Sequence, residues 1–304
     1  MSFSEEVRAE LAGIAPEREC DRLAELSALF HFAGRLHLLG RGEVSLHLDL
    51  SSPAAARRAF ALLRGFGVRS EIRTYQRRAF GRETRYQLHV EGDAREVLER
   101  AGVVDARFRP RDRPPRKVVS RSCCRSAYVR GALLASGSVS GPPSPHLEVR
   151  SETREGADAV AAAAAAEGGE LRVAERADHV VAYAKGLDRI AGVLAAAGAS
   201  EAALALEERA VVGSTRARAN RLANADHANL VRAGRAAHAQ LQAVRRLERN
   251  GRLESLSPQL REIASLRLKH PSLSLRELAA KSEPSISKSS AQRRLNALLK
   301  LAKQ

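Results

Sequence analysis

A cluster of polar and basic side chains near the C-terminal end of the sequence has the chemistry needed to bind DNA. Arginine can donate two hydrogen bonds to the edge of guanine, and glutamine can pair in a similar way with adenine. Serine and lysine suit the phosphate oxygens of the backbone. The residues that we expect to contact DNA are Ser274, Ser287, Lys288, Ser289, Ser290, Gln292, Arg293, Arg294 and Asn296.

Local signals around this cluster predict the two helices that must present it. Ser274 and Glu277 have the spacing of a capping box, in which each side chain accepts a backbone amide proton at the start of a helix. Pro284 ends that helix, and Ser287 can cap a second one. Two short helices joined by a tight turn form a helix–turn–helix, whose second helix enters the major groove. Its expected core includes Leu278, Ile286, Ala291, Leu295 and Leu298.

The distribution of charge favours double-stranded DNA as the partner. The chain has 51 Lys and Arg against 35 Asp and Glu, a net charge of +16. Residues 214–304 carry 19 basic and 6 acidic side chains, and residues 107–121 supply a further +6, so the remainder sums to −3. A basic segment can be no more than a solvated surface. Here, however, the positive charge is concentrated beside a predicted helix–turn–helix. Lysines and arginines in that position can neutralise DNA phosphates and release their counterions, which favours binding.

The three cysteines, Cys20, Cys123 and Cys124, form no pattern typical of a disulfide framework or a zinc site. The adjacent pair is poorly placed to chelate one ion, so we predict buried thiols, no metal and no cofactor. No stretch approaches the roughly 20 apolar residues of a membrane span, and residues 1–6 lack the chemistry of a signal peptide. We therefore expect a cytoplasmic protein associated with the nucleoid.

The first 200 residues contain a diverged internal duplication. Residues 26–34 and 129–137 each end an apolar helix rich in small residues, and their final glycines lie 103 positions apart. In both halves the pattern then predicts a strand, a helix, two more strands and a closing helix that ends in Ala-Gly. The predicted elements are strands 44–50 and 146–150, helices 54–65 and 155–167, and strand pairs 68–75 with 84–90 and 170–175 with 178–184. This order predicts a pseudo-twofold α+β domain.

The duplicated helix that ends in small residues and glycine resembles the motif of the LAGLIDADG homing endonucleases. The resemblance implies that the two motif helices pack at the pseudo-twofold axis. It also implies that the residue before each final glycine is an acid that binds a metal for DNA cleavage. Here those positions are Ala33 and Ser136, and neither can replace a carboxylate. The neighbouring His31 and Leu134 do not restore the site, and a lone histidine on an apolar helix is more often a packed core residue.

Four segments together are similar to the WhiA transcription regulators of Gram-positive bacteria: residues 1–11, 123–139, 220–224 and 284–289. This resemblance implies a degenerate homing-endonuclease domain joined to a C-terminal DNA-binding domain. It also implies a role in sporulation in filamentous actinobacteria, and in cell division or chromosome segregation elsewhere. One departure is Ala225-Asp226-His227, where the family leads us to expect a stretch similar to Cys-Glu-Thr.

These observations predict a sequence-specific DNA-binding transcription regulator that is not an enzyme. An active LAGLIDADG endonuclease is the runner-up, and it would need the two missing acids. A third interpretation, compatible with the first, makes the N-terminal domain a module that binds a ligand or another transcription regulator. The predicted organisation is an N-terminal helical extension (1–19), a duplicated domain (20–200, halves 20–106 and 120–200, linker 107–119), a linker with a long bridging helix (201–250) and the helix–turn–helix (256–304).

Three connecting segments have less certain roles. The arginine- and proline-rich linker 107–119 should be extended and on the surface, where its arginines either touch phosphate or keep the segment solvated. The hairpin tip 76–82 is a second candidate DNA contact. Between 215 and 249 an apolar stripe predicts one helix that packs on the C-terminal module or, alternatively, forms a homodimeric coiled coil. The stripe consists of Leu222, Leu230, Ala233, Ala237, Leu241, Val244 and Leu247.

Overall fold

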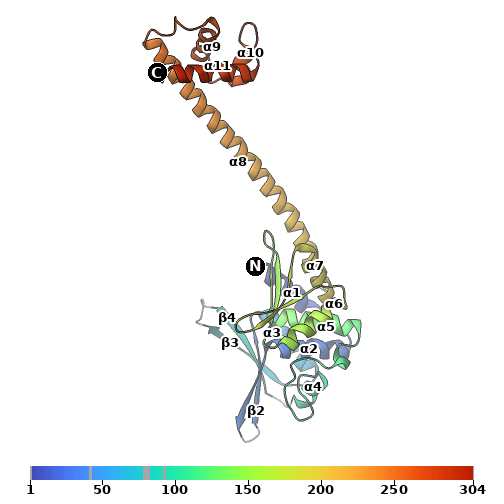
Figure 1. The fold of residues 1–304 in the computed structure, drawn as a ribbon. Helices are drawn as coiled ribbons and strands as arrows, with labels where there is room; N and C mark the ends of the chain where they lie inside the picture. Colours follow the sequence, from blue (N-terminus) through green and yellow to red (C-terminus); the bar gives the residue numbers. More distant parts are fainter. Residues whose placement is uncertain (1, 41–42, 78–82, 92–93, 304) are drawn as a thin grey trace. The chain divides into compact units, whose positions relative to one another are not determined.

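The computed structural model describes residues 2–40, 43–77, 83–91 and 94–303 (Figure 1). The chain divides into two compact units, here called the N-terminal unit (Met1–Ser214) and the C-terminal unit (Thr215–Gln304). No helix in the described ranges is long and apolar enough to cross a lipid bilayer. Each unit has its own core and is described separately below.

The N-terminal unit contains the predicted duplication. After helix α1(Phe3–Gly13), the first half consists of α2(Glu19–Ala33), β1(Gly34–Gly40), β2(Glu43–Leu50), α3(Pro53–Gly65), β3(Ser70–Arg77), β4(Glu83–Val90) and α4(Arg95–Arg100). The second half consists of α5(Ser122–Ser136), β5(Gly137–Ser140), β6(His146–Ser151), α6(Arg154–Ala165), β7(Arg172–Glu175), β8(Val180–Lys185) and α7(Leu187–Ala197). The two antiparallel sheets have equivalent strand orders, β1-β2-β4-β3 and β5-β6-β8-β7. The expected pseudo-twofold α+β fold is therefore confirmed.

Strands β1 and β5, which directly follow the two motif helices, were not among the predicted strands. Each motif helix ends on its glycine in an extended conformation, with the glycine amide bonded back to Phe30 or Leu133. The same glycine is the first residue of the next strand, so no turn separates helix from strand. Gly34 pairs with Leu48 of β2, and Gly137 pairs with Val149 of β6. Without a turn signal, the sequence pattern could not show where these edge strands begin.

Helices α2 and α5 pack against each other at the centre of the N-terminal unit (Figure 1). A Cβ atom added to Gly131 of α5 would lie 2.5 Å from the carbonyl oxygen of Glu25 and 2.8 Å from the Cβ of Ala28 on α2. Only glycine therefore permits this approach. Large apolar side chains on both helices are fully buried, among them Leu26, Leu29, Leu133 and Leu134. Burial on several sides explains why neither helix shows a clear apolar stripe.

One buried carboxylate links four helices of this unit. Glu25 of α2 is 0% exposed, and its two oxygens accept hydrogen bonds from Arg58 of α3 (Nε–Oε1 2.6 Å) and Arg130 of α5 (Nε–Oε2 2.9 Å). Arg130 also donates to the carbonyl of Ala197, the last residue of α7, at 3.3 Å. The carboxylate is thus paired and hydrogen-bonded, as a charge removed from water must be.

The arginine-rich linker is only partly as predicted. Its arginines Arg111 and Arg113 are exposed, but Pro114 and Val118 are buried, and residues Arg116–Val119 form a 3-10 turn. The carboxylate of Asp105 accepts the backbone N–H groups of Arg107 and Arg109. The prediction of a fully extended surface segment was wrong, because the prolines and valines of the linker also contribute apolar surface to the core.

The C-terminal unit comprises most of α8(Ser200–Arg249) together with α9(Pro258–Lys269), α10(Leu275–Ala280) and α11(Lys288–Leu301). Helix α8 starts at Ser200, earlier than the predicted residue 215, and the Glu10 carboxylate of α1 accepts the amides of Glu201 and Ala202 at its start. Acceptors of this kind satisfy the free amides of a helix N-terminus.

The apolar stripe of α8 packs only in its last part. Val244 and Leu247 are buried in the core of the C-terminal unit, whereas Leu222 and Leu230 are 64% and 72% exposed. The prediction that the whole stripe packs on the C-terminal module was therefore wrong for its first half. The sequence pattern shows that the apolar residues recur on one face of the helix. It does not show how much of that face the other helices of the C-terminal unit can bury.

Candidate nucleic-acid interface

Helices α10 and α11 form the predicted helix–turn–helix, and both begin with the expected caps. Ser274 Oγ accepts the amide of Glu277 at 3.3 Å, and Glu277 Oε2 accepts the amide of Ser274 at 2.8 Å. The hydrogen bonds from Ser274 lower the pKa of the Glu277 carboxyl. Ser287 Oγ accepts the amide of Ser290 at 3.1 Å and starts α11. These caps fix where each helix begins, and therefore which side chains share each face.

The buried face of α11 is the predicted one. Ala291, Leu295 and Leu298 are at most 1% exposed and join Leu278 of α10 and Ile263 of α9 in one core. Ile286, also expected in the core, is half-buried and packs against it. Burial of this face leaves the opposite face of α11 to solvent.

The exposed face of α11 forms a shallow hollow that gathers most of the residues expected to bind DNA. Lys288, Ser289, Gln292, Arg293 and Asn296 line it, together with Lys300. The amide Nε2 of Gln292 donates to Asn296 Oδ1 at 3.0 Å, so these two side chains are already oriented relative to each other. Donors and acceptors of this kind, on one exposed face of a rigid helix, match the edges of base pairs in a major groove.

The structure places the other four expected residues away from the centre of this face. Ser274 and Ser287 are N-caps, and the Ser287 hydroxyl donates to the Ser290 hydroxyl at 3.0 Å. Arg294 turns towards α9, where its NH1 lies 3.4 Å from Glu262 Oε2. These side chains hold the module together, although exposed hydroxyls at helix N-termini remain accessible to a phosphate.

Sequence reasoning did not find three residues, Glu262, Arg267 and Gln240, that hold the helix–turn–helix in position. Glu262 of α9 accepts the amide of Glu283 at 2.7 Å, so it fixes the turn as well as Arg294. Arg267, 1% exposed, donates to the carbonyl of Leu273 at 2.8 Å and to Gln240 of α8 at 2.9 Å. Burial lowers the pKa of this guanidinium. An arginine beside an apolar face gives no sequence signal that separates a buried role from a solvated one.

Ala33 and Ser136, at the positions where the LAGLIDADG resemblance leads us to expect acids, are packed or hydrogen-bonded. Ala33 is 5% exposed, and Ser136 Oγ donates to the carbonyl of Arg150 at 2.7 Å. His31 lies near Ser27, with 3.3 Å between its Nδ1 and the Ser27 hydroxyl, and burial lowers its pKa to about 4. It is therefore a neutral imidazole at neutral pH, but it is only partly buried and lines a hollow beside Gly34, so the core role expected for it is met only in part.

The first sheet presents a polar outer face beside the hairpin considered as a second DNA contact. Asp49 accepts hydrogen bonds from Arg85 Nε at 3.1 Å and from the Tyr75 hydroxyl at 2.9 Å. The rings of His37 and His47 stack on this face with their centroids 5.1 Å apart. Of the candidate tip 76–82, residues 78–82 lie outside the described ranges, so the contact expected there stays a prediction.

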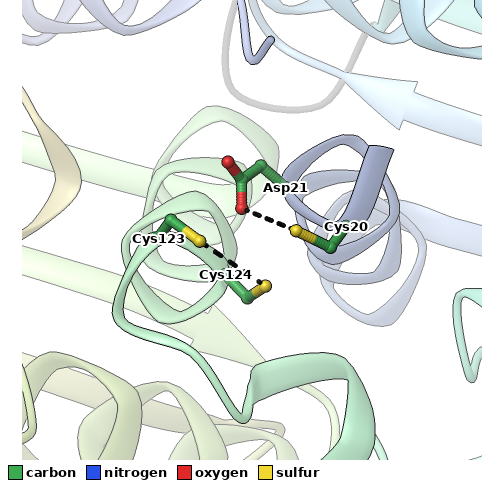
Figure 2. Close-up of side chains that lie close together, drawn as sticks. All are labelled: Cys20, Asp21, Cys123 and Cys124. Carbon is green, nitrogen blue, oxygen red and sulfur yellow. Dashed lines mark hydrogen bonds between the residues drawn. The ribbon is translucent and has the colours of Figure 1, made fainter. Parts of the chain in front are cut away.

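The prediction of buried thiols holds for Cys124 but was wrong for Cys20 and Cys123, which are partly exposed. Cys20 at the start of α2 meets Cys123 and Cys124 at the start of α5, and Asp21 joins them (Figure 2). The sequence places Cys20 about a hundred residues from the other two, and only the pairing of the motif helices brings them together.

Comparison with protein families gives three matches along the chain. A model described as the WhiA N-terminal LAGLIDADG-like domain matches residues 19–104, and one described as the WhiA LAGLIDADG-like domain matches residues 125–216. A model described as the WhiA C-terminal HTH domain matches residues 219–302.

Curated relatives and solved structures agree with these matches. A probable cell division protein WhiA from Symbiobacterium thermophilum is 38% identical over 306 residues, which cover 99% of this chain and 98% of that protein. The one from Streptomyces avermitilis is 37% identical over 317 residues, 99% of this chain and 92% of that protein. The crystal structure of full-length WhiA from Thermatoga maritima aligns over 100% of this chain and 98% of its own with a TM-score of 0.59 and 23% identity, which supports the fold.

Proposed function

The chain belongs to the WhiA family, and from that premise we propose that it is a sequence-specific DNA-binding regulator of transcription that acts in cell division. The observation that carries the proposal is the exposed face of α11, where donors and acceptors gather on a helix whose opposite face is buried. The relatives are named as probable cell division proteins, which supports a role in cell division. The family resemblance extends the proposed role to chromosome segregation and sporulation. Such a protein would associate with the nucleoid.

Roles on α11 follow from position and side-chain chemistry. Arg293 lies beyond the first turn, where helix–turn–helix side chains reach base edges, and its guanidinium suits guanine. Gln292 and Asn296, joined by their hydrogen bond, present amide groups beside it. Lys288 and Ser289 at the helix N-terminus are placed for phosphate, which that end of a helix attracts. The other four candidate residues would either contact the DNA phosphate backbone or hold the helix–turn–helix together: Ser274, Ser287, Ser290 and Arg294.

The N-terminal unit, in this proposal, serves as a scaffold or a protein-binding module rather than as a nuclease. The unit carries a net charge of +3 in all, because the +6 of residues 107–121 outweighs the −3 of its other residues. Away from that basic segment its slightly acidic surface suits a partner with basic character, such as another transcription regulator. The chain would then act through four parts: a helical extension (1–19), a duplicated domain (20–200), a bridging helix (201–250) and the DNA-binding module (256–304).

Replacing Arg293 should distinguish sequence-specific contacts with the bases from the electrostatic attraction that any DNA exerts. Arg293→Ala is expected to weaken binding to the preferred site by about 1–3 kcal/mol, and to weaken random DNA less. Lys288→Ala should weaken both DNAs alike and lower the slope of log affinity against log salt by about one unit. The preferred site is first selected from a random pool with the full-length protein, and affinities are then measured by fluorescence anisotropy at several salt concentrations.

The control variant is Arg246→Ala, which removes the same charge from an exposed position of α8. It should change affinity for both DNAs little and equally. If Arg293→Ala and Arg246→Ala weaken specific and random DNA to the same extent, α11 supplies only charge and sequence must be read elsewhere.

The protein is expected not to nick DNA, because Ala33 and Ser136 stand where metal-binding carboxylates would be needed. Supercoiled plasmid that carries the preferred site is incubated with the protein and magnesium or manganese, and the nicked fraction is measured on a gel. Asp112 and Glu152 line the hollow beside Gly34 and are the acids there that could substitute for the missing carboxylates. Nicking above background that disappears in Asp112→Asn or Glu152→Gln would show an active nuclease.

A further inference from the structure

Four side chains with metal-binding atoms meet between the N-termini of the two motif helices (Figure 2). One sulfur or oxygen atom from each of Cys20, Asp21, Cys123 and Cys124 can be chosen so that all four lie within 4.8 Å of one another. Cys20 Sγ is 3.4 Å from Asp21 Oδ1, and the sulfurs of Cys123 and Cys124 are 4.0 Å apart. The sulfurs of the two adjacent cysteines are therefore close enough to bind one ion, although their adjacency in the sequence is unfavourable for a metal site.

The cluster follows from the duplication of the fold. The offset of 103 that relates Gly34 to Gly137 also relates Cys20 to Cys123 and Asp21 to Cys124. Each motif helix thus contributes two neighbouring ligands from its first turn, and the packing of α2 on α5 brings the two pairs together. In the described residues this is the sole group of three or more His, Cys, Asp and Glu side chains gathered closely enough for one ion.

We propose that Cys20, Asp21, Cys123 and Cys124 bind a single divalent cation that prefers thiolates, Zn²⁺. Zinc–sulfur bonds of about 2.3 Å in a tetrahedron place neighbouring ligand atoms about 3.8 Å apart, so small side-chain movements complete the geometry. The three thiolates select zinc over magnesium or calcium, which prefer oxygen ligands. The four atoms lie too close together to surround a cluster of several iron atoms, so one ion fits the space.

Binding exchanges protons for the metal. Burial is the main cause that raises the pKa of the Cys124 thiol to about 12, and the neighbouring thiols of Cys20 and Cys123 add to it. Without a metal this thiol is protonated at neutral pH, so zinc must displace its proton to bind the thiolate. The product carries two negative charges in excess, and the helix N-termini and Arg18 offset them. Arg18 NH1 already lies 3.7 Å from Cys123 Sγ.

The cation would have a structural role at this position. It would join the first turns of α2 and α5, whereas Ala33 and Ser136 are the last residues of the same helices. At 1.5 Å rise per residue the two ends are about 18 Å apart, so an ion here cannot serve the lost endonuclease site. Cys124 and Asp21 are buried while Cys20 and Cys123 are half-exposed, which gives an ion access from solvent.

The test uses the full-length chain purified under reducing conditions. After incubation with zinc and dialysis, elemental mass spectrometry should find one zinc per chain. Cobalt in place of zinc should give the visible bands of a tetrahedral ion and the charge-transfer bands of thiolate ligands. Cys20→Ser, Asp21→Asn and Cys124→Ser should each weaken zinc binding, the cysteine variants by about a hundredfold or more. Apparent affinity should rise with pH, since about one factor of ten per pH unit accompanies each displaced proton.

Glu17→Gln is the control, since it removes a nearby exposed negative charge outside the cluster and should leave zinc binding unchanged. Circular dichroism shows whether Cys124→Ser folds. If it does not, zinc binding is compared in the Cys20→Ser and Asp21→Asn variants instead, since Cys20 is half-exposed. The proposal is overturned if the native chain retains less than about a tenth of a zinc per chain. It is equally overturned if Cys20→Ser binds zinc like the native chain, or if mild oxidation forms a Cys20 disulfide in a chain that does not bind zinc.

Discussion

Glu25→Gln is expected to lower the free energy of unfolding of the N-terminal unit by about 3–5 kcal/mol. The substitution keeps the shape of the side chain but removes its charge. Arg58 and Arg130 would then remain beside a neutral amide, with side chains that are 9% and 7% exposed. Two buried guanidinium groups without a carboxylate carry a desolvation cost that the remaining hydrogen bonds do not offset.

Amide hydrogen exchange followed by mass spectrometry measures this effect in each unit separately. Protection of peptides from α2 and α5 should fall by about two to four orders of magnitude, since each factor of ten corresponds to about 1.4 kcal/mol. Peptides from α11 should keep their protection and serve as the internal reference, because that helix belongs to the other unit.

Glu19→Gln is the matched variant on the same helix. Glu19 also pairs with an arginine, Arg100, but their side chains are 54% and 41% exposed, so the expected loss is within about 1 kcal/mol. Equal small losses for Glu19→Gln and Glu25→Gln would mean that the buried network does not support the fold.

The contrast between these two glutamates shows where sequence reasoning ends. Glu19 and Glu25 both lie within the same apolar helix, α2, and nothing in the local sequence pattern distinguishes the buried acid from the exposed one. Arg130 lies 105 residues from Glu25, and the pairing depends on the packing of α2 against α5. Long-range pairs of this kind cannot be predicted before the tertiary structure is known, because no periodic sequence pattern links the two partners.

The helix–turn–helix could be predicted because its signals are local. Ser274 and Glu277 cap one helix within four residues, and Ser287 caps the next. The spacing of Ala291, Leu295 and Leu298 then assigns a buried face without reference to the rest of the chain. The candidate DNA-binding face was predicted as its complement. Glu262 and Arg267, which hold that face in position from α9, act across the module and were therefore missed.

The cysteine cluster is an intermediate case. Its ligands are far apart in the sequence, but the offset of 103 that identifies the duplication also aligns Cys20 with Cys123. Combining that offset with close packing of the two motif helices would have brought the cysteines together. The spacing rules for zinc ligands within one segment hid this arrangement, because each helix supplies only two neighbouring residues.

Leu295→Ala is expected to lower the stability of the C-terminal unit by about 2–5 kcal/mol, because the side chain is 0% exposed and its loss leaves a cavity. Domains of this size are stable by only about 5–15 kcal/mol, so a large part of the stability would be lost. Exchange protection of α9, α10 and α11 should fall together, since all three contribute to one core. Peptides from α2 and α5 should be unaffected.

The same substitution tests whether the fold of α11, and not its charge alone, is needed to bind DNA. Leu295→Ala leaves every charged side chain in place, yet it should weaken specific and random DNA together as the folded fraction falls. Arg293→Ala should instead keep exchange protection and lose mainly the preferred site. Leu222→Ala makes the same truncation at a residue of α8 that is 64% exposed, so its stability should stay within about 0.5 kcal/mol. If Leu295→Ala is as stable as Leu222→Ala, or unfolds the unit without any loss of DNA affinity, then binding does not depend on a folded α11.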